Sequence, residues 1–248
     1  MFTYNQAVEH VTESCQKSST KNREYFAHIL GLFGEPHEHL RVIHLAGTNG
    51  KESVCAMLAS VLRQTDASVG VFTSPHLESY NERVTVNNAP IPDGDFAPQI
   101  ELIARHSREP RMSYFEIMTP VAFHYFRQQA VDYAVIETGT GGLHDATNVV
   151  SRPLLSVITS VGRDHVAMLG GTIPEIASQK SGIIKRGRPA AVGKLPPEAL
   201  DIVRAAASER GAALYYYVSI HIGRESKLLI VGRQKAPLST GAVSSGVT

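Results

Sequence analysis

The chain alternates between compact apolar runs and longer stretches with helical periodicity. Apolar residues recur every three or four positions, which predicts amphipathic helices, over 3–16, 22–33, 52–64, 94–107, 114–129, 173–180 and 197–209. Short apolar runs, which predict strands, occupy 41–46, 69–73, 83–86, 133–136, 154–159, 189–192 and 213–217. This alternation is typical of an α/β fold, with a mainly parallel sheet covered by helices on both faces.

Turn residues separate these elements, and the character of the chain changes near its C-terminal end. Asn87 and Asn88 predict a hairpin turn inside the Pro- and Asn-rich segment 74–92. Beyond Tyr217 the apolar periodicity weakens, and the last residues are rich in Ser, Gly, Ala and Pro. We therefore expect one α/β domain over 1–217 and a disordered or non-homologous tail over 218–248.

Composition and charge narrow the class of protein. The chain has 248 residues, of which 43% are hydrophobic and 19% charged, as in a globular protein with a substantial core. With 24 basic and 23 acidic residues, the net charge of +1 does not indicate a nucleic-acid or membrane surface. Two cysteines are too few for a disulfide framework, and neither a signal peptide nor a membrane-spanning run is recognisable. We expect a cytoplasmic monomer.

The strongest chemical signal is a glycine-rich loop between a predicted strand and a predicted helix. Its residues are Gly47, Thr48, Asn49, Gly50, Lys51 and Ser53. Glycines let backbone N–H groups turn toward an anion, and the helix N-terminus adds partial positive charge. Lys51 can reach terminal phosphate oxygens, and Ser53 can offer its hydroxyl to a bound magnesium ion. The loop predicts a nucleoside triphosphate site; the alternative is a glycine-rich turn without nucleotide.

Polar side chains follow three other predicted strands. Ser74 comes after 69–73, Glu137 after 133–136 and His165 soon after 154–159. Ligands bind beyond the carboxyl ends of parallel strands, and these three groups together can ligate magnesium. Each has a structural alternative, because Ser before Pro is often a turn residue and His165 can cap a following helix. A carboxylate directly after a buried strand is uncommon unless it is paired with another group. The position of Glu137 therefore favours a functional role for this residue.

Five ordered blocks of the chain resemble the folylpolyglutamate synthase/dihydrofolate synthase family of the Mur ligase superfamily. The blocks are Ala46–Lys51; Phe72–Leu77 with Glu82 and Arg83; Tyr114–Glu116; Glu137–Gly142 with Asp145–Val149; and Ile158–Gly162 with Asp164, His165 and Lys180–Lys185. They follow the family order from near the N-terminus to about Tyr217. Because five ordered blocks are far more specific than one phosphate loop, the resemblance implies the central, nucleotide-binding domain of such a ligase.

The resemblance implies an ATP-dependent ligase that phosphorylates a pteroate or folate carboxylate and lets the amine of L-glutamate attack the acyl phosphate. It implies ATP and two magnesium ions. Ser74 and Glu137 match one metal site, His165 matches a second, and Lys180 matches a lysine that is carbamylated in the family. Without the resemblance, Lys180 would be read as a solvated cation at a helix end. Catalytic roles are implied for Lys51, His165 and Lys180, and pteroate contacts for Ser113, His144, Asp145 and Ala146.

Three features depart from the family pattern. Glu52 replaces a glycine and places a carboxylate beside the expected phosphates, where like charges cost on the order of several kcal/mol unless the side chain points outward. Leu143 replaces an arginine near the expected pterin site. The match also fades before the family's second domain, so we expect a truncated copy with impaired ligase activity. The alternatives are another Mur-type amide ligase and a non-catalytic nucleotide-binding remnant.

Overall fold

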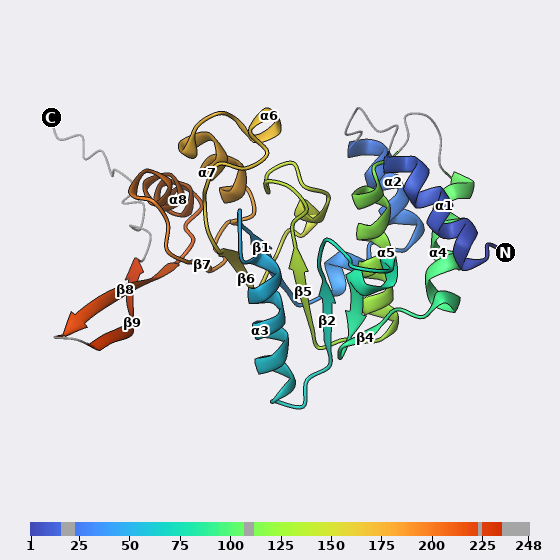
Figure 1. Ribbon diagram of the computed structural model, residues 1–248, viewed down its shortest axis with the longest axis horizontal. Coiled ribbons are helices and arrows are strands. Elements are labelled where there is room, and N and C mark those ends of the chain that lie inside the picture. The colour runs from blue at the N-terminus through green and yellow to red at the C-terminus, as the bar shows by residue number, and fades with distance from the viewer. Residues whose placement is uncertain (16–22, 107–111, 223–224, 235–248) are drawn as a thin grey trace, which may run out of the picture.

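The computed structural model describes residues 1–15, 23–106, 112–222 and 225–234 (Figure 1). The helices are α1 (Tyr4–Cys15), α2 (Arg23–Leu32), α3 (Lys51–Arg63), α4 (Asp93–His106), α5 (Tyr114–Gln128), α6 (Val166–Leu169), α7 (Ile173–Ser181) and α8 (Pro197–Glu209), with short 3-10 helices at Pro36–His39, Tyr80–Arg83 and Ala146–Val149. The strands are β1 (Val42–Ala46), β2 (Val69–Phe72), β3 (Val84–Val86), β4 (Ala89–Pro90), β5 (Tyr133–Glu137), β6 (Leu155–Ile158), β7 (Ala190–Val192), β8 (Leu214–Ile222) and β9 (Glu225–Gln234).

Within the described residues the strands form one sheet in the order β4-β3-β2-β5-β1-β6-β7-β8-β9. Strands β2, β5, β1, β6, β7 and β8 run parallel, and the edges are antiparallel, which confirms the predicted fold class. Strand β1 lies between β5 and β6, with Leu45 opposite Glu137 and Ala46 opposite Ile158. The segment that follows β1 therefore emerges between the ends of two neighbouring strands.

Alternation along β1 divides the core between the two faces of the sheet. Ile43 and Leu45 pack against Cys55 and Ala59 of α3, which crosses in front of the sheet in Figure 1. Val42, His44 and Ala46 are buried on the other face, because successive side chains of a strand point to opposite sides. Helices therefore cover both faces, as the sequence predicts.

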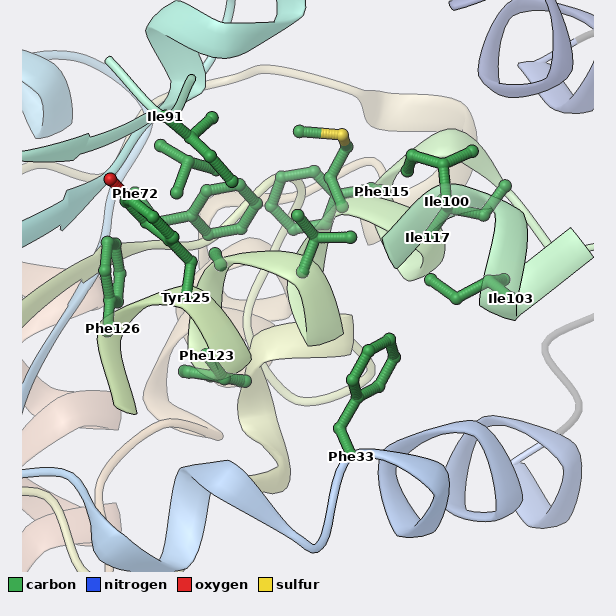
Figure 2. Packing of buried hydrophobic residues seen from close by; sticks show 14 of the residues in the cluster. Phe33, Phe72, Ile91, Ile100, Ile103, Phe115, Ile117, Phe123, Tyr125 and Phe126 are labelled. Atoms are coloured by element: carbon green, nitrogen blue, oxygen red, sulfur yellow. The ribbon is translucent and has the colours of Figure 1, made fainter. Parts of the chain in front are cut away.

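Helices α1, α2, α4 and α5 gather at one end of the molecule around an aromatic core (Figures 1 and 2). The rings of Phe72 and Phe115 stack with their centroids 5.2 Å apart, and Phe123 and Phe126 lie on the same helix, α5 (Figure 2). A second core cluster is formed by α7, α8 and the strands beneath them. His44 lies on β1 between Val42 of the first cluster and Ala46 of the second.

The predicted elements agree with the observed ones to within a few residues, and the hairpin prediction is confirmed. Asn87 and Asn88 have φ values of 51° and 70° and join β3 to β4. Of the two alternatives for the predicted tail, disorder does not hold over 218–222 and 225–234, because β8 continues to Ile222 and pairs with β9. This pairing does not test the alternative of a non-homologous tail. Pairing satisfies backbone groups that an edge strand would leave open. The rest of the predicted tail, 235–248, lies outside the described residues. In the described part of the chain no helix is both long and apolar enough to cross a membrane.

Candidate functional site

The loop after β1 is held in shape by residues at the end of β6. The backbone N–H of Thr48 donates to the Ser160 carbonyl at 3.0 Å, and that of Asn49 donates to Ser160 Oγ at 2.9 Å. Thr159 Oγ1 donates to the Asn49 carbonyl at 2.7 Å. Because partners on a neighbouring strand fix the loop backbone, its free N–H groups keep their direction before any ligand binds.

Two glycines of the loop are required for different reasons. A Cβ at Gly47 would lie 1.9 Å from Thr159 Oγ1, so only glycine allows the loop to approach β6 this closely. Gly50 has a φ of 78° and caps the N-terminus of α3 in the left-handed region, which favours glycine. The loop backbone therefore depends on both residues, as expected for a phosphate-binding turn.

Lys51, Ser74 and Glu137 meet at the carboxyl ends of β1, β2 and β5. Lys51 Nζ lies 3.7 Å from Glu137 Oε1 and donates to the Gly47 carbonyl at 3.0 Å. The backbone N–H of Ser74 donates to Glu137 Oε2 at 3.2 Å. The Glu137 side chain is only 3% exposed, and that of Lys51 is 15% exposed. The structure thus brings together three residues that the sequence placed at separate strand ends.

The Glu137 carboxylate is costly to ionise in this position. Burial raises its pKa to about 6, while the Ser74 N–H and the Lys51 ammonium act in the opposite direction. The nearby Glu52 carboxylate raises the pKa further, although Glu52 itself is exposed in the first turn of α3. A site that delivers additional positive charge would therefore favour the ionised form of Glu137.

Lys180 is buried in the last turn of α7 and is not the solvated cation of the alternative interpretation. Only 2% of the residue is exposed. Burial, followed by repulsion from Lys51, lowers the pKa of Lys180 to about 8, and Asp164 opposes this change. The Lys180 ammonium therefore interacts electrostatically with both Lys51 and Asp164.

Of the three predicted metal ligands, the structure brings Ser74 and Glu137 into contact but does not bring His165 to them. Ser74 adjoins Glu137, whereas His165 begins α6 with its ring half exposed and its Nε2 3.6 Å from Asp164 Oδ1. Across the described segments, no three His, Cys, Asp or Glu side chains form a group arranged to hold a metal ion. A metal bound beside Glu137 would therefore need further ligands from hydroxyl groups, water or substrate.

A cavity of about 550 Å³ is bordered by α2, α5, the segment 143–149 and the segments that follow α7 and α8. Its wall contains Phe26, Ala27, Glu116, Leu143, His144, Asp145, Ala146, Asn148, Val149, Gly182, Ile184, Lys185, Arg186 and Arg210. Three predicted substrate residues, His144, Asp145 and Ala146, therefore border one cavity. The volume is in the range of small-molecule sites.

The fourth predicted substrate residue, Ser113, has a structural role in this arrangement. Its Oγ accepts from the Glu116 backbone N–H at 3.3 Å, and its backbone N–H donates to Glu116 Oε2 at 2.8 Å, which forms a capping box at the start of α5. The Ser113 hydroxyl also donates to Glu116 Oε2 at 2.8 Å. Glu116, rather than Ser113, lines the cavity. The sequence did not predict Glu116, Lys185 or Arg210 as residues of the cavity wall. Lys185 and Arg210 lie outside helices and strands, so no periodic pattern indicates which way their side chains point.

Comparison with known proteins agrees with this geometry. The Mur ligase middle domain model matches residues 45–226. A dihydrofolate synthase/folylpolyglutamate synthase from Bacillus subtilis is 44% identical over 192 residues, which cover 75% of this chain and 44% of that protein. A folylpolyglutamate synthase from Lacticaseibacillus casei is 37% identical over 218 residues, which cover 85% of this chain and 51% of that protein.

Solved structures show the same similarity in three dimensions. An FPGS–AMPPCP–folate complex superposes with a TM-score of 0.79 at 32% identity, covering 92% of this chain and 58% of the other. The chain spans about half the length of the curated relatives described above. The phosphate loop, the strand order and these matches lead to one conclusion: the chain belongs to the Mur ligase family, in its folylpolyglutamate synthase/dihydrofolate synthase branch.

Proposed function

We propose that this chain binds ATP and supplies the nucleotide site of a ligase that joins L-glutamate to a pteroate or folate carboxylate through an acyl phosphate. The observation that carries the proposal is the contact of 3.7 Å between Lys51 Nζ and the buried Glu137 carboxylate, beside a preformed phosphate loop. The names of the relatives and the AMPPCP and folate bound in a similar structure support the substrate classes. Because the chain spans about half of those relatives, the complete reaction is part of the proposal.

Two regions of the chain have different roles in the proposed reaction: the loop after β1 binds the phosphates, and the cavity binds the acyl acceptor. The loop N–H groups and Lys51 hold the terminal phosphates and stabilise charge that develops during phosphoryl transfer. The cavity bordered by Asp145 and Ala146 holds the acyl acceptor and orients its carboxylate. The amine of glutamate attacks the carbonyl carbon of the acyl phosphate and the C–N bond forms. Phosphate leaves with the C–O bond electrons, and the nitrogen loses one proton to solvent.

The donor groups fit magnesium. Glu137 is a buried carboxylate without enough neighbouring positive charge to keep its pKa low, and the hydroxyl-bearing Ser74 is hydrogen-bonded to it through the backbone. Hard oxygen ligands of this kind suit Mg²⁺. Ser74 and Glu137 would hold one ion and His165 a second. Bound ions would supply charge neutralisation on the transferring phosphoryl group.

Lys180 is the residue we propose to be carbamylated. A pKa of about 8 leaves part of the lysine as a neutral amine near neutral pH, and the neutral amine is the form that adds CO₂. The ammonium first loses one proton, and the neutral amine loses a second as the N–C bond to CO₂ forms and one C=O bond of CO₂ becomes C–O⁻. A buried cation thereby becomes a carboxylate, with two protons released to solvent. This exchange relieves the repulsion between Lys180 and Lys51 and adds a second oxygen donor near the phosphates.

Two departures from the family are proposed to reduce activity or change its specificity. Glu52, exposed beside the loop, adds negative charge where phosphates approach, which weakens ATP binding. Leu143 gives the cavity wall an apolar side chain that is 38% exposed, in place of the cation typical of the family. Both effects act on ligand affinity rather than on the fold.

The test is ADP release and glutamate transfer by the purified chain, with pteroate, folate and a cell-wall-type carboxylate offered separately. Glutamate transfer to pteroate or folate supports the proposal. Transfer to the cell-wall precursor alone would show another Mur-type amide ligase. Nucleotide binding without turnover would show a non-catalytic nucleotide-binding domain. Gel filtration and cell fractionation test the accompanying inference of a cytoplasmic monomer, which binds these small molecules rather than nucleic acid or membrane.

A further inference from the structure

A buried histidine connects the phosphate-loop strand to the cavity wall. His44 lies on β1, three residues before Gly47, and its exposed fraction is zero. Its Nε2 is 2.7 Å from Oγ1 of Thr147, which is also fully buried. Neither residue is used in the proposed phosphate chemistry, so the contact calls for a separate explanation.

The direction of this hydrogen bond follows from the next one. Thr147 Oγ1 donates its single hydrogen to Asp145 Oδ1 at 2.6 Å. It must therefore accept from His44, which places a hydrogen on Nε2 of the ring. Burial, with a smaller effect from Lys185, lowers the pKa of His44 to about 3, in agreement with a neutral ring. The buried Nδ1 has no hydrogen-bond partner in the described part of the molecule.

The hydrogen bonds from His44 through Thr147 to Asp145 are called the relay below. The relay ends on the Asp145 carboxylate, which also binds backbone N–H groups of two loops. Asp145 Oδ1 also accepts from the Thr147 backbone N–H at 3.0 Å, and Oδ2 accepts from the Thr140 backbone N–H at 2.9 Å. Thr140 belongs to the glycine-rich segment that follows Glu137, and Asp145 borders the cavity. A change in the Asp145 orientation therefore moves the cavity wall and the backbone that leaves Glu137.

We propose that His44 is a positioning residue: its Nε2–H, acting through Thr147, fixes the Asp145 carboxylate in the cavity wall and thereby sets the affinity for the acyl acceptor. The identity of that acceptor, a pteroate or folate, rests on the proposed function. Because fully satisfied buried networks orient their members strongly, removing one donor loosens the group at the other end. The strand that ends in the phosphate loop thus also aligns the second substrate.

Four single variants with matched chemistry, and one double variant, test the relay by calorimetry with folate and, separately, with ADP. His44→Leu removes the donor and Thr147→Val the hydroxyl, whereas His44→Gln and Thr147→Ser keep a hydrogen-bonding group. We expect His44→Leu and Thr147→Val each to weaken folate binding about 10-fold, or about 1.4 kcal/mol. The double variant should lose no more than either single one, because both changes break the same relay. The Gln and Ser variants should stay within about 2-fold of the parent, and ADP affinity should stay within about 2-fold throughout.

Nuclear magnetic resonance separates this inference from the proposed function. In the parent, the ¹⁵N shifts of His44 should show the neutral Nε2–H tautomer from about pH 5 to 8. The Thr140 amide resonance should shift in His44→Leu and not in His44→Gln. Unchanged folate affinity in His44→Leu, or an equal loss of ADP and folate affinity, would contradict the positioning role. If the parent binds neither pteroate nor folate, the proposed function fails; an Nδ1–H tautomer or an unmoved Thr140 resonance overturns the relay itself.

Discussion

Glu137→Gln should make the ligand-free protein more stable at neutral pH while it removes metal and nucleotide binding. The Glu137 carboxylate is 3% exposed, and its pKa rises from 4.5 to about 6, chiefly because of burial. Each pKa unit corresponds to about 1.4 kcal/mol, so ionising this group costs the fold about 2 kcal/mol. Glutamine has nearly the same shape as the protonated acid and does not ionise.

The sign of the pH dependence follows from the two pKa values. Between about pH 4.5 and 6 the folded protein holds a proton that the unfolded chain has already lost, so the parent loses stability as pH rises through this window. The Gln variant does not. The difference in unfolding free energy should therefore be near zero below about pH 4.5 and reach about 2 kcal/mol above about pH 6.

The assay is urea unfolding of both proteins at several pH values, with Glu9→Gln as the control. Glu9 is exposed in the middle of α1, and its replacement should change stability by less than about 0.5 kcal/mol. A Glu137→Gln variant that is no more stable than the parent at pH 7.5 would refute the reasoning. It would mean that the contact with Lys51 outweighs the cost of burial.

Three further predictions concern the loop and Lys180. Glu52→Gln should tighten Mg·ATP binding several-fold in calorimetry, because it removes a charge that also raises the pKa of Glu137; equal affinity of the parent and the variant would exclude this effect. Lys180 should give a carbamate signal with ¹³C-labelled bicarbonate that grows as pH rises through about 8 and is absent in Lys180→Arg; no signal in the parent would end the carbamylation proposal. Gly47→Ala should destabilise the protein by about 1–3 kcal/mol in thermal melting, since its Cβ would meet Thr159 Oγ1 at 1.9 Å, whereas Gly94→Ala, with open space around it, should not.

Much of the site was predictable because parallel strands end at one edge of a sheet. The residues after β1, β2 and β5 had to lie near one another once the strands were recognised, and Lys51, Ser74 and Glu137 do so. The capping box formed by Ser113 and Glu116 was also readable from the spacing of Ser and Glu. The pteroate contact implied for Ser113 stays a prediction, because a local cap and a ligand contact use the same residue type.

Other features depend on contacts between distant segments that no local pattern specifies. His44 is 103 residues from Thr147, and a histidine within an apolar run carries no signal of its partner. Apolar and polar residues alternate over Val218–Ile222, which is typical of a strand and agrees with the pairing of β8 with β9. The expectation of a tail rested instead on the weaker apolar periodicity beyond Tyr217. The burial of Lys180 follows from the packing of α7 against its neighbours, and sequence alone favours a solvated lysine at a helix end.

Titration of the purified chain with Mg·AMPPCP, beside Lys51→Met and the exposed-lysine control Lys194→Met, tests whether the loop after β1 is a nucleotide site. Lys51 contacts Glu137 and the loop carbonyls, whereas Lys194 is exposed after β7. We expect saturable binding by the parent and the control, and at least about 10-fold weaker binding by Lys51→Met. No binding by the parent at about 1 mM nucleotide, or equal binding by all three proteins, would contradict the assignment of this site.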